Sequence, residues 1–127
     1  MSISRLVLER LYVAPSAYFD DVVFRHGEGT ELSYRYEFNG ETRPASIRFS
    51  RVRAFRFRTE GVASLSDFEA DGQLVEVFDS PWIKEVRAQQ ARYGSWEWPI
   101  RHFLCYVSDA GAYEFAAADY EWVQRPE

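Results

Sequence analysis

The stretch between residues 30 and 50 constrains the fold more than any other part of the chain. Apolar and polar residues alternate up to Asn39-Gly40, a dipeptide that suits the two positive-φ positions of a type I′ turn. The pattern predicts a β-hairpin whose apolar residues share one face: Leu32, Tyr34 and Tyr36 on one strand, Ala45, Ile47 and Phe49 on the other. Pro44 cannot donate to a ladder, so the returning strand is expected at a sheet edge or irregular near its start.

Further strand signals lie on both sides of this hairpin. Between Ser46 and Arg58 the apolar phase changes twice, which predicts one long bent or bulged strand. Asp71-Gly72 indicates a second hairpin, formed by the segment around Phe68 and residues 74–78. Residues 3–13 fit either a helix or two strand fragments joined by a bulge, and we favour the strand.

One helix is predicted, over residues 81–93. Ser80 is a good N-cap, Pro81 suits the first helical position, and Gly94 suits the position after the last turn. The spacing predicts that one face packs on a sheet, with Ile83 beside it: Trp82, Val86, Gln89 and Tyr93.

The last third of the chain returns to strand patterns. Residues 100–107 are almost wholly apolar on both faces, which is typical of a central strand, and Ser108 to Gly111 form a turn. Aromatic residues make up 17% of the chain, well suited to strands that pack rings on a pleated face. We therefore predict a β-rich α+β domain of about seven or eight antiparallel strands with one main helix. The sheet is either open and curved or a partly closed barrel. The predicted core includes Leu32, Tyr34, Tyr36, Ile47, Phe49, Leu104 and Tyr106.

The chain organisation predicts a single domain over residues 1–127, because no repeat, low-complexity tract or linker divides it. Cys105 is the only cysteine, so no intramolecular disulfide can form and a reducing cytoplasm is expected. Charges interrupt each apolar run well short of the roughly 18 residues that a membrane span needs. We expect a cytoplasmic protein that does not enter the membrane.

Charge is distributed unevenly along the chain. Residues 1–60 carry ten arginines and eight acids, a net of +2, whereas residues 61–127 carry five basic residues and twelve acids, a net of −7. The acidic total argues against a nucleic-acid binder, which would need a basic face. The acidic second half suits a basic protein partner.

The ionisable residues give little indication of catalysis. His26 and His102 are the only histidines and no metal-ligand spacing occurs, so no metal and no cofactor are predicted. Cys105 is expected to be a small core residue rather than a nucleophile. With a three-residue turn at 109–111, Glu114 would lie opposite Tyr106 and too far from His102 for a His–Glu dyad. We therefore expect a hydrogen bond between Tyr106 and Glu114 and assign no catalytic residue.

Two features allow a binding role. Five arginines without an intervening acid follow residue 47: Arg48, Arg51, Arg53, Arg56 and Arg58. They would either protect a sheet edge from aggregation or, at Arg51, Arg53, Arg56 and Arg58, contact an anion. Trp96 and Trp98 occupy a loop before Pro99 that cannot bury both rings in a regular sheet, so we expect partner or ligand contacts there and at Arg101 and His102.

The 22 aromatic residues raise the question of self-association, because so short a chain has limited core to bury them. They predict either a weak dimer, through the Trp96–Trp98 loop or the helix face, or ordinary surface exposure.

A pattern over residues 78–123 resembles small uncharacterised bacterial domains, some of them immunity proteins of toxin systems. Its residues are Ser80-Pro81-Trp82-Ile83, Trp98-Pro99-Ile100-Arg101-His102-Phe103 and Tyr113-Glu114-Phe115-Ala116-Ala117. The resemblance implies a bacterial cytoplasmic protein that binds another protein, and it transfers no catalytic residue. We therefore expect a non-catalytic protein-binding module, of which a toxin-immunity inhibitor is one form. The alternative is a small-molecule or enzymatic cleft beside His102.

Overall fold

The computed structural model describes residues 5–11, 23–26, 29–59, 71–93, 99–107 and 111–126. About two thirds of these residues lie in strands, and the remaining regular structure is one α-helix followed by a short 3₁₀ turn. This composition confirms the β-rich α+β class. Among the described residues, no helix is both long enough and apolar enough to cross a membrane.

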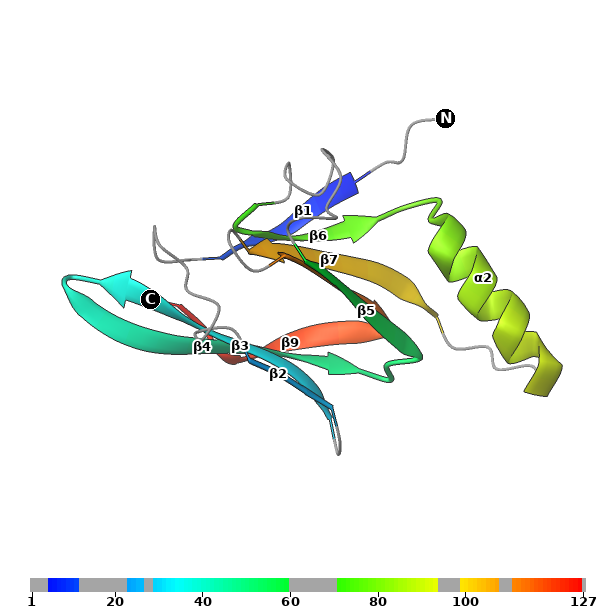
Figure 1. Ribbon diagram of the computed structural model, residues 1–127, viewed down its shortest axis with the longest axis horizontal. Helices are drawn as coiled ribbons and strands as arrows, with labels where there is room; N and C mark the ends of the chain where they lie inside the picture. The colour runs from blue at the N-terminus through cyan, green and yellow to red at the C-terminus, as the bar shows by residue number, and fades with distance from the viewer. Residues whose placement is uncertain are drawn as a thin grey trace.

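The strands form two antiparallel sheets (Figure 1). The five-stranded sheet runs in the order β1 (Arg5–Arg10), β6 (Gln73–Val77), β7 (Arg101–Val107), β8 (Gly111–Ala117), β5 (Ala54–Thr59). The four-stranded sheet runs in the order β2 (Val23–His26), β3 (Thr30–Phe38), β4 (Glu41–Ser50), β9 (Asp119–Gln124). The strands therefore divide between two packed layers, in place of the single curved sheet or partial barrel that the sequence left open.

The hairpin of β3 and β4 has the register expected from its turn. Leu32 pairs with Ile47 and Tyr34 with Ala45, while Asn39 and Gly40 both adopt positive φ, at 51° and 77°. On its other side β4 pairs with β9 only from Ser46 onward. Pro44 therefore lies where β4 has no second neighbour among the described strands, which fits its missing donor.

The expected long strand from Ser46 to Arg58 is instead two strands in different sheets. β4 ends at Ser50, Arg51 takes a left-handed conformation with φ of 52°, and β5 begins at Ala54 in the five-stranded sheet. β8 and β9 change sheets beside this corner, where the Ala118 amide donates to the Ser50 carbonyl at 3.0 Å. The change in which sequence positions are apolar between residues 46 and 58 thus marks the point where the chain crosses from one sheet to the other. The side chains that face the core alternate separately in β4 and in β5.

The main core lies between the two sheets. Phe49 of β4 stacks on Phe115 of β8 with ring centroids 3.9 Å apart, and its centroid is 5.6 Å from that of Phe103 of β7. All seven predicted core residues are buried, which confirms that prediction. Leu104 and Tyr106, however, belong to a second cluster with Val75, Val77 and Ala112. Strand β7 is buried on both faces because it lies in the middle of its sheet and carries apolar residues on each side.

The helix α2 (Pro81–Gln90) continues into the 3₁₀ turn η3 (Ala91–Tyr93), in agreement with the predicted range. Its apolar side packs with Ile100, just before β7, and with Ala116 of β8, and in Figure 1 it lies apart from the four-stranded sheet. The buried helical residues are Ile83 and Val86, whereas Gln89 is exposed. The helix is therefore rotated from the predicted face toward Ile83, which replaces the polar Gln89 on the buried side.

Two further expectations concern β1 and β6. β1 is a strand with a register shift between Val7 and Glu9. Of the two alternatives for residues 3–13, the bulged strand is therefore confirmed and the helix is not. Gly72 adopts a positive φ of 69°, as a turn residue would. The neighbours of β6 are β1 and β7 rather than the segment before Asp71, and Phe68 lies outside the described residues.

Candidate functional site

A buried polar network joins the start of α2 to the five-stranded sheet, and it begins at Ser80. The Ser80 hydroxyl oxygen accepts the Ile83 amide at 3.3 Å, as an N-cap side chain does, and lies 2.7 Å from Nδ1 of His102. Ser80 and His102 are each only 5% exposed. Strand β6 brings the chain to this point, and Asp79 makes the sharp turn with a left-handed φ of 55°. The capping signal that predicted the helix therefore also places Ser80 against the sheet.

His102 continues the network to Glu114. Its Nε2 lies 2.8 Å from Oε1 of the Glu114 carboxylate. A carboxylate only accepts, so Nε2 carries a hydrogen, and in the neutral ring Nδ1 is left to accept the Ser80 hydroxyl. The edge of the imidazole faces Trp82, with ring centroids 4.9 Å apart. Both ring nitrogens of His102 are thus engaged within the protein.

The contact between His102 and Glu114 overturns the expected register of the last hairpin. Val107 pairs with Gly111 and Leu104 with Glu114, whereas the sequence argument placed Glu114 opposite Tyr106. The connection between β7 and β8 spans residues 108–110, one residue earlier than the turn we expected, which shifts the pairing by two residues. Glu114 therefore lies diagonally across from His102 on the same face, and the expected bond from Tyr106 is replaced by a His–Glu pair.

Glu114 is held by two arginines of β5 as well. Arg56 contacts its carboxylate through Nε at 2.6 Å and Nη2 at 3.1 Å, and Arg58 through Nη2 at 3.1 Å. Burial by itself would raise the pKa of Glu114, but hydrogen bonds from His102 and Arg56 and their charges outweigh it and lower the pKa to about 2. Arg56 also lies over the Trp82 ring at 4.4 Å. The network therefore links α2, β7, β8 and β5.

The distances from Ser80 to His102 and from His102 to Glu114 are those of a Ser–His–acid triad, but the surroundings oppose that chemistry. Pro81 has no N–H to stabilise an oxyanion directly after the serine. Glu114 already accepts from two guanidinium groups, so it has little capacity to stabilise a forming imidazolium. The Ser80 oxygen is committed to the helix amide and is buried. The arrangement is suited to anchoring the helix on the sheet.

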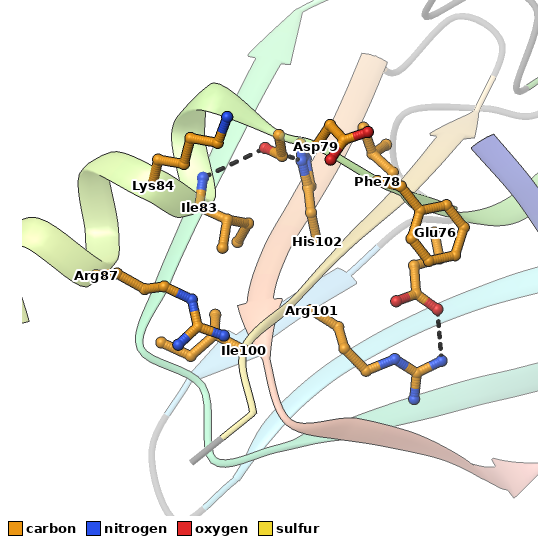
Figure 2. A pocket seen from close by; sticks show the side chains of 11 residues that line it. Glu76, Phe78, Asp79, Ile83, Lys84, Arg87, Ile100, Arg101 and His102 are labelled. Carbon is orange, nitrogen blue, oxygen red and sulfur yellow. Dashed lines mark hydrogen bonds and ion pairs between the residues drawn. The ribbon is translucent and has the colours of Figure 1, made fainter. Parts of the chain in front are cut away.

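A cavity of about 240 Å³ opens beside this network, between the end of β6, the first turns of α2 and the start of β7 (Figure 2). Apolar side chains form part of its wall: Val77, Phe78, Ile83 and Ile100. Arg101, one of the predicted contact residues, lines it together with His102, and Arg101 bonds to Glu76 at 2.7 Å and Asp119 at 3.1 Å. These contacts raise the pKa of Arg101, chiefly through the hydrogen bond to Glu76. A cavity therefore lies beside His102, whose imidazole is itself packed within the protein.

Strand β5 forms an edge of the five-stranded sheet, with β8 as its hydrogen-bonded neighbour among the described strands. Phe55 and Phe57 lie on one face of β5 and are 46% and 45% exposed. Arg56 and Arg58 lie on the opposite face, toward Glu114. An exposed apolar edge strand is unusual in a monomeric protein, because it offers backbone groups and hydrophobic area to another chain.

The structure places the other predicted residues in several different settings. Arg48 bonds to Glu31 at 3.5 Å. Arg51 and Arg53 lie in the corner between β4 and β5, and each makes other polar or electrostatic contacts there. The arginine row is therefore divided among separate contacts. Trp96 and Trp98 lie outside the described residues.

No pattern in the sequence identified Ser80 as a partner of His102, or Arg56 and Arg58 as partners of Glu114. These contacts depend on which strands become neighbours, and no local pattern carries that information.

The structure also bears on metal binding and on the cysteine. Among the described residues, no group of three or more histidine, cysteine or acidic side chains could hold a metal ion. Cys105 is fully buried in the main core, and this burial raises the pKa of its thiol. The thiol therefore stays protonated and shielded from reagents.

No protein-family model, curated protein or solved structure matches this chain.

Proposed function

We propose that this protein is a non-catalytic binding module of the bacterial cytoplasm that recognises another protein through strand β5. The observation that carries the proposal is the exposure of Phe55 and Phe57 on an edge strand. Aromatic side chains of this kind are common anchors of protein interfaces, and an edge strand can accept an extended segment of a partner. The polar network around His102 supports the non-catalytic part, because its groups are used to hold the helix.

The charges of β5 favour a partner that differs from this chain. Arg56 and Arg58 both bond to Glu114, so two guanidinium groups lie on this face of the edge strand. Pairing two copies along β5 would bring the arginines of both copies together, which is unfavourable. An extended segment in which apolar residues alternate with acidic ones would place its apolar side chains on Phe55 and Phe57. Its acidic side chains would then face the arginines.

A toxin is one partner class that suits this proposal, given the resemblance of residues 78–123 to domains that include immunity proteins. The loop with Trp96 and Trp98 is a second proposed contact. The basic partner suggested by the acidic second half of the chain would use a different surface from β5.

Self-association through the tryptophan loop or the helix face remains a prediction, which sedimentation over a hundredfold dilution series would test.

The test compares four forms of the full chain as bait in an extract of its own cells. They are the wild type, Phe55→Ser/Phe57→Ser, Trp96→Ala/Trp98→Ala, and the control Val123→Ser, which alters a residue of similar exposure on β9. A captured protein is then purified, and hydrogen exchange of the reconstituted complex is measured.

The proposal expects a partner that the wild type and the β9 control retain and the β5 variant loses, with slowed exchange of amides in residues 54–59. Equal recovery by the β5 variant, or protection elsewhere only, would contradict the β5 contact. Loss of the partner with the tryptophan variant alone would move the interface to that loop.

A further inference from the structure

The cavity between α2, β6 and β7 has an apolar wall and an unbalanced charge at its opening. Among its charged residues, Arg101 is paired with Glu76, and it also bonds to Asp119, which does not line the cavity. Lys84 and Arg87 remain, and neither side chain has a hydrogen bond or ion pair with the described residues. Asp79 is the one remaining acid among the lining residues. The opening therefore carries two cations against one anion.

The helix determines where these cations lie. Arg87 follows Ile83 by four residues, so both project from the same side of α2. In Figure 2 the Arg87 side chain extends toward Ile100, whereas the Arg101 guanidinium turns to Glu76. Arg87 thus lines the cavity together with its apolar side chains and keeps its guanidinium donors for another group.

From this arrangement we propose that the cavity binds a small organic monocarboxylate with a hydrocarbon body, whose carboxylate pairs with Arg87. The hydrocarbon part contacts Val77, Phe78, Ile83 and Ile100. This site is separate from the β5 contact, and either proposal can fail without the other.

Size and charge select this class of ligand. A volume of about 240 Å³ is below the roughly 300 to 1,000 Å³ of most ligand pockets, so the ligand is small. A single carboxylate balances the excess of one positive charge at the opening. Inorganic phosphate would bring a second charge close to Asp79 and would leave the apolar wall without a contact. A neutral analogue would lack the pairing with the guanidinium.

Benzoate is a suitable probe, with benzyl alcohol as its neutral counterpart and inorganic phosphate as the anion without an apolar body. Each is titrated into the ¹⁵N-labelled full chain while amide shifts are followed by NMR. The variants are Arg87→Gln, Asp79→Asn and the control Arg92→Gln, which removes a cation of the following turn that does not line the cavity. Asn tolerates the left-handed backbone at position 79, so this variant removes the charge while keeping the turn.

We expect saturable shifts for residues around the cavity with benzoate, and binding at least about threefold weaker for benzyl alcohol and phosphate. Arg87→Gln should weaken benzoate binding about three- to fivefold, and Asp79→Asn should strengthen it about twofold, while Arg92→Gln leaves it unchanged. Absence of saturable shifts at the cavity would overturn the proposal. Equal benzoate affinity in the Arg87→Gln and Arg92→Gln variants, or equal affinity for benzyl alcohol, would overturn it as well.

Discussion

Replacing Glu114 by Gln tests whether the buried network stabilises the fold. The substitution keeps the size of the side chain and removes the charge that Arg56, Arg58 and His102 share. The folded state lowers the pKa of Glu114 from its ordinary value of 4.5 to about 2. Each unit corresponds to about 1.4 kcal/mol, so the ionised carboxylate contributes about 3 kcal/mol to the free energy of unfolding at neutral pH.

The sign of the pH dependence follows from the direction of this shift. A carboxylate whose pKa is lower in the folded state stabilises the protein fully above its unfolded pKa of 4.5, and that contribution is lost as the pH falls toward 2. By pH 3 it should be less than half of its neutral value. The difference in unfolding free energy between wild type and Glu114→Gln should therefore be about 3 kcal/mol at pH 7 and about 1 kcal/mol at pH 3.

The exposure of the two arginines limits the size of the effect. Arg56 and Arg58 have side chains 42% and 30% exposed, so they can reach water when Glu114 loses its charge. The cost should therefore stay below the upper range of about 5 kcal/mol seen when one member of a fully buried ion pair is removed.

Urea unfolding at pH 7 and pH 3 measures this difference. Glu41→Gln is the matched control, because Glu41 also bonds to an arginine, Arg43 at 3.3 Å, but its side chain is 70% exposed. The control should change the unfolding free energy by no more than about 0.5 kcal/mol at either pH. A loss below about 1 kcal/mol for Glu114→Gln at pH 7, or an equal loss at both pH values, would refute the reasoning.

Three other substitutions or modifications test separate parts of the structure. Gly111→Ala should destabilise by at least about 2 kcal/mol in urea unfolding, because φ is 142° and a Cβ would lie 2.2 Å from the Arg58 carbonyl oxygen. Gly29→Ala should change little, because a Cβ there would make only ordinary contacts with the Arg48 side chain, at 3.6 Å or more. Ser80→Ala should cost about 2 kcal/mol, because both the helix cap and the partner of the His102 ring are lost, and a cost below about 0.5 kcal/mol would contradict the network. Iodoacetamide should label Cys105 only as fast as the protein unfolds, and labelling at the rate of a free thiol would show that the core is open.

Local patterns in the sequence were sufficient where neighbouring residues decide the structure. The hairpin around Asn39-Gly40 was predicted with its register, because the turn type and the alternation of side chains together allow one pairing. The start of the helix was predicted from Ser80 and Pro81, since capping is a contact within a few residues. The buried strand β7 was identified from its apolar residues on both faces. The seven core residues were likewise predicted from the apolar pattern of their strands, and all seven are buried.

Tertiary structure alone decided how these elements combine. The pairing of β5 with β8, which brings Arg56 and Arg58 to Glu114, joins residues more than fifty positions apart, and alternation along a strand does not encode its neighbour. A shift of two residues in the β7–β8 pairing keeps every side chain on the same face, so the apolar pattern could not distinguish the expected register from the observed one. That shift determines whether Glu114 meets Tyr106 or His102. The cavity beside α2 likewise depends on how the helix rotates onto the sheet, which is determined by packing among residues distant in the chain.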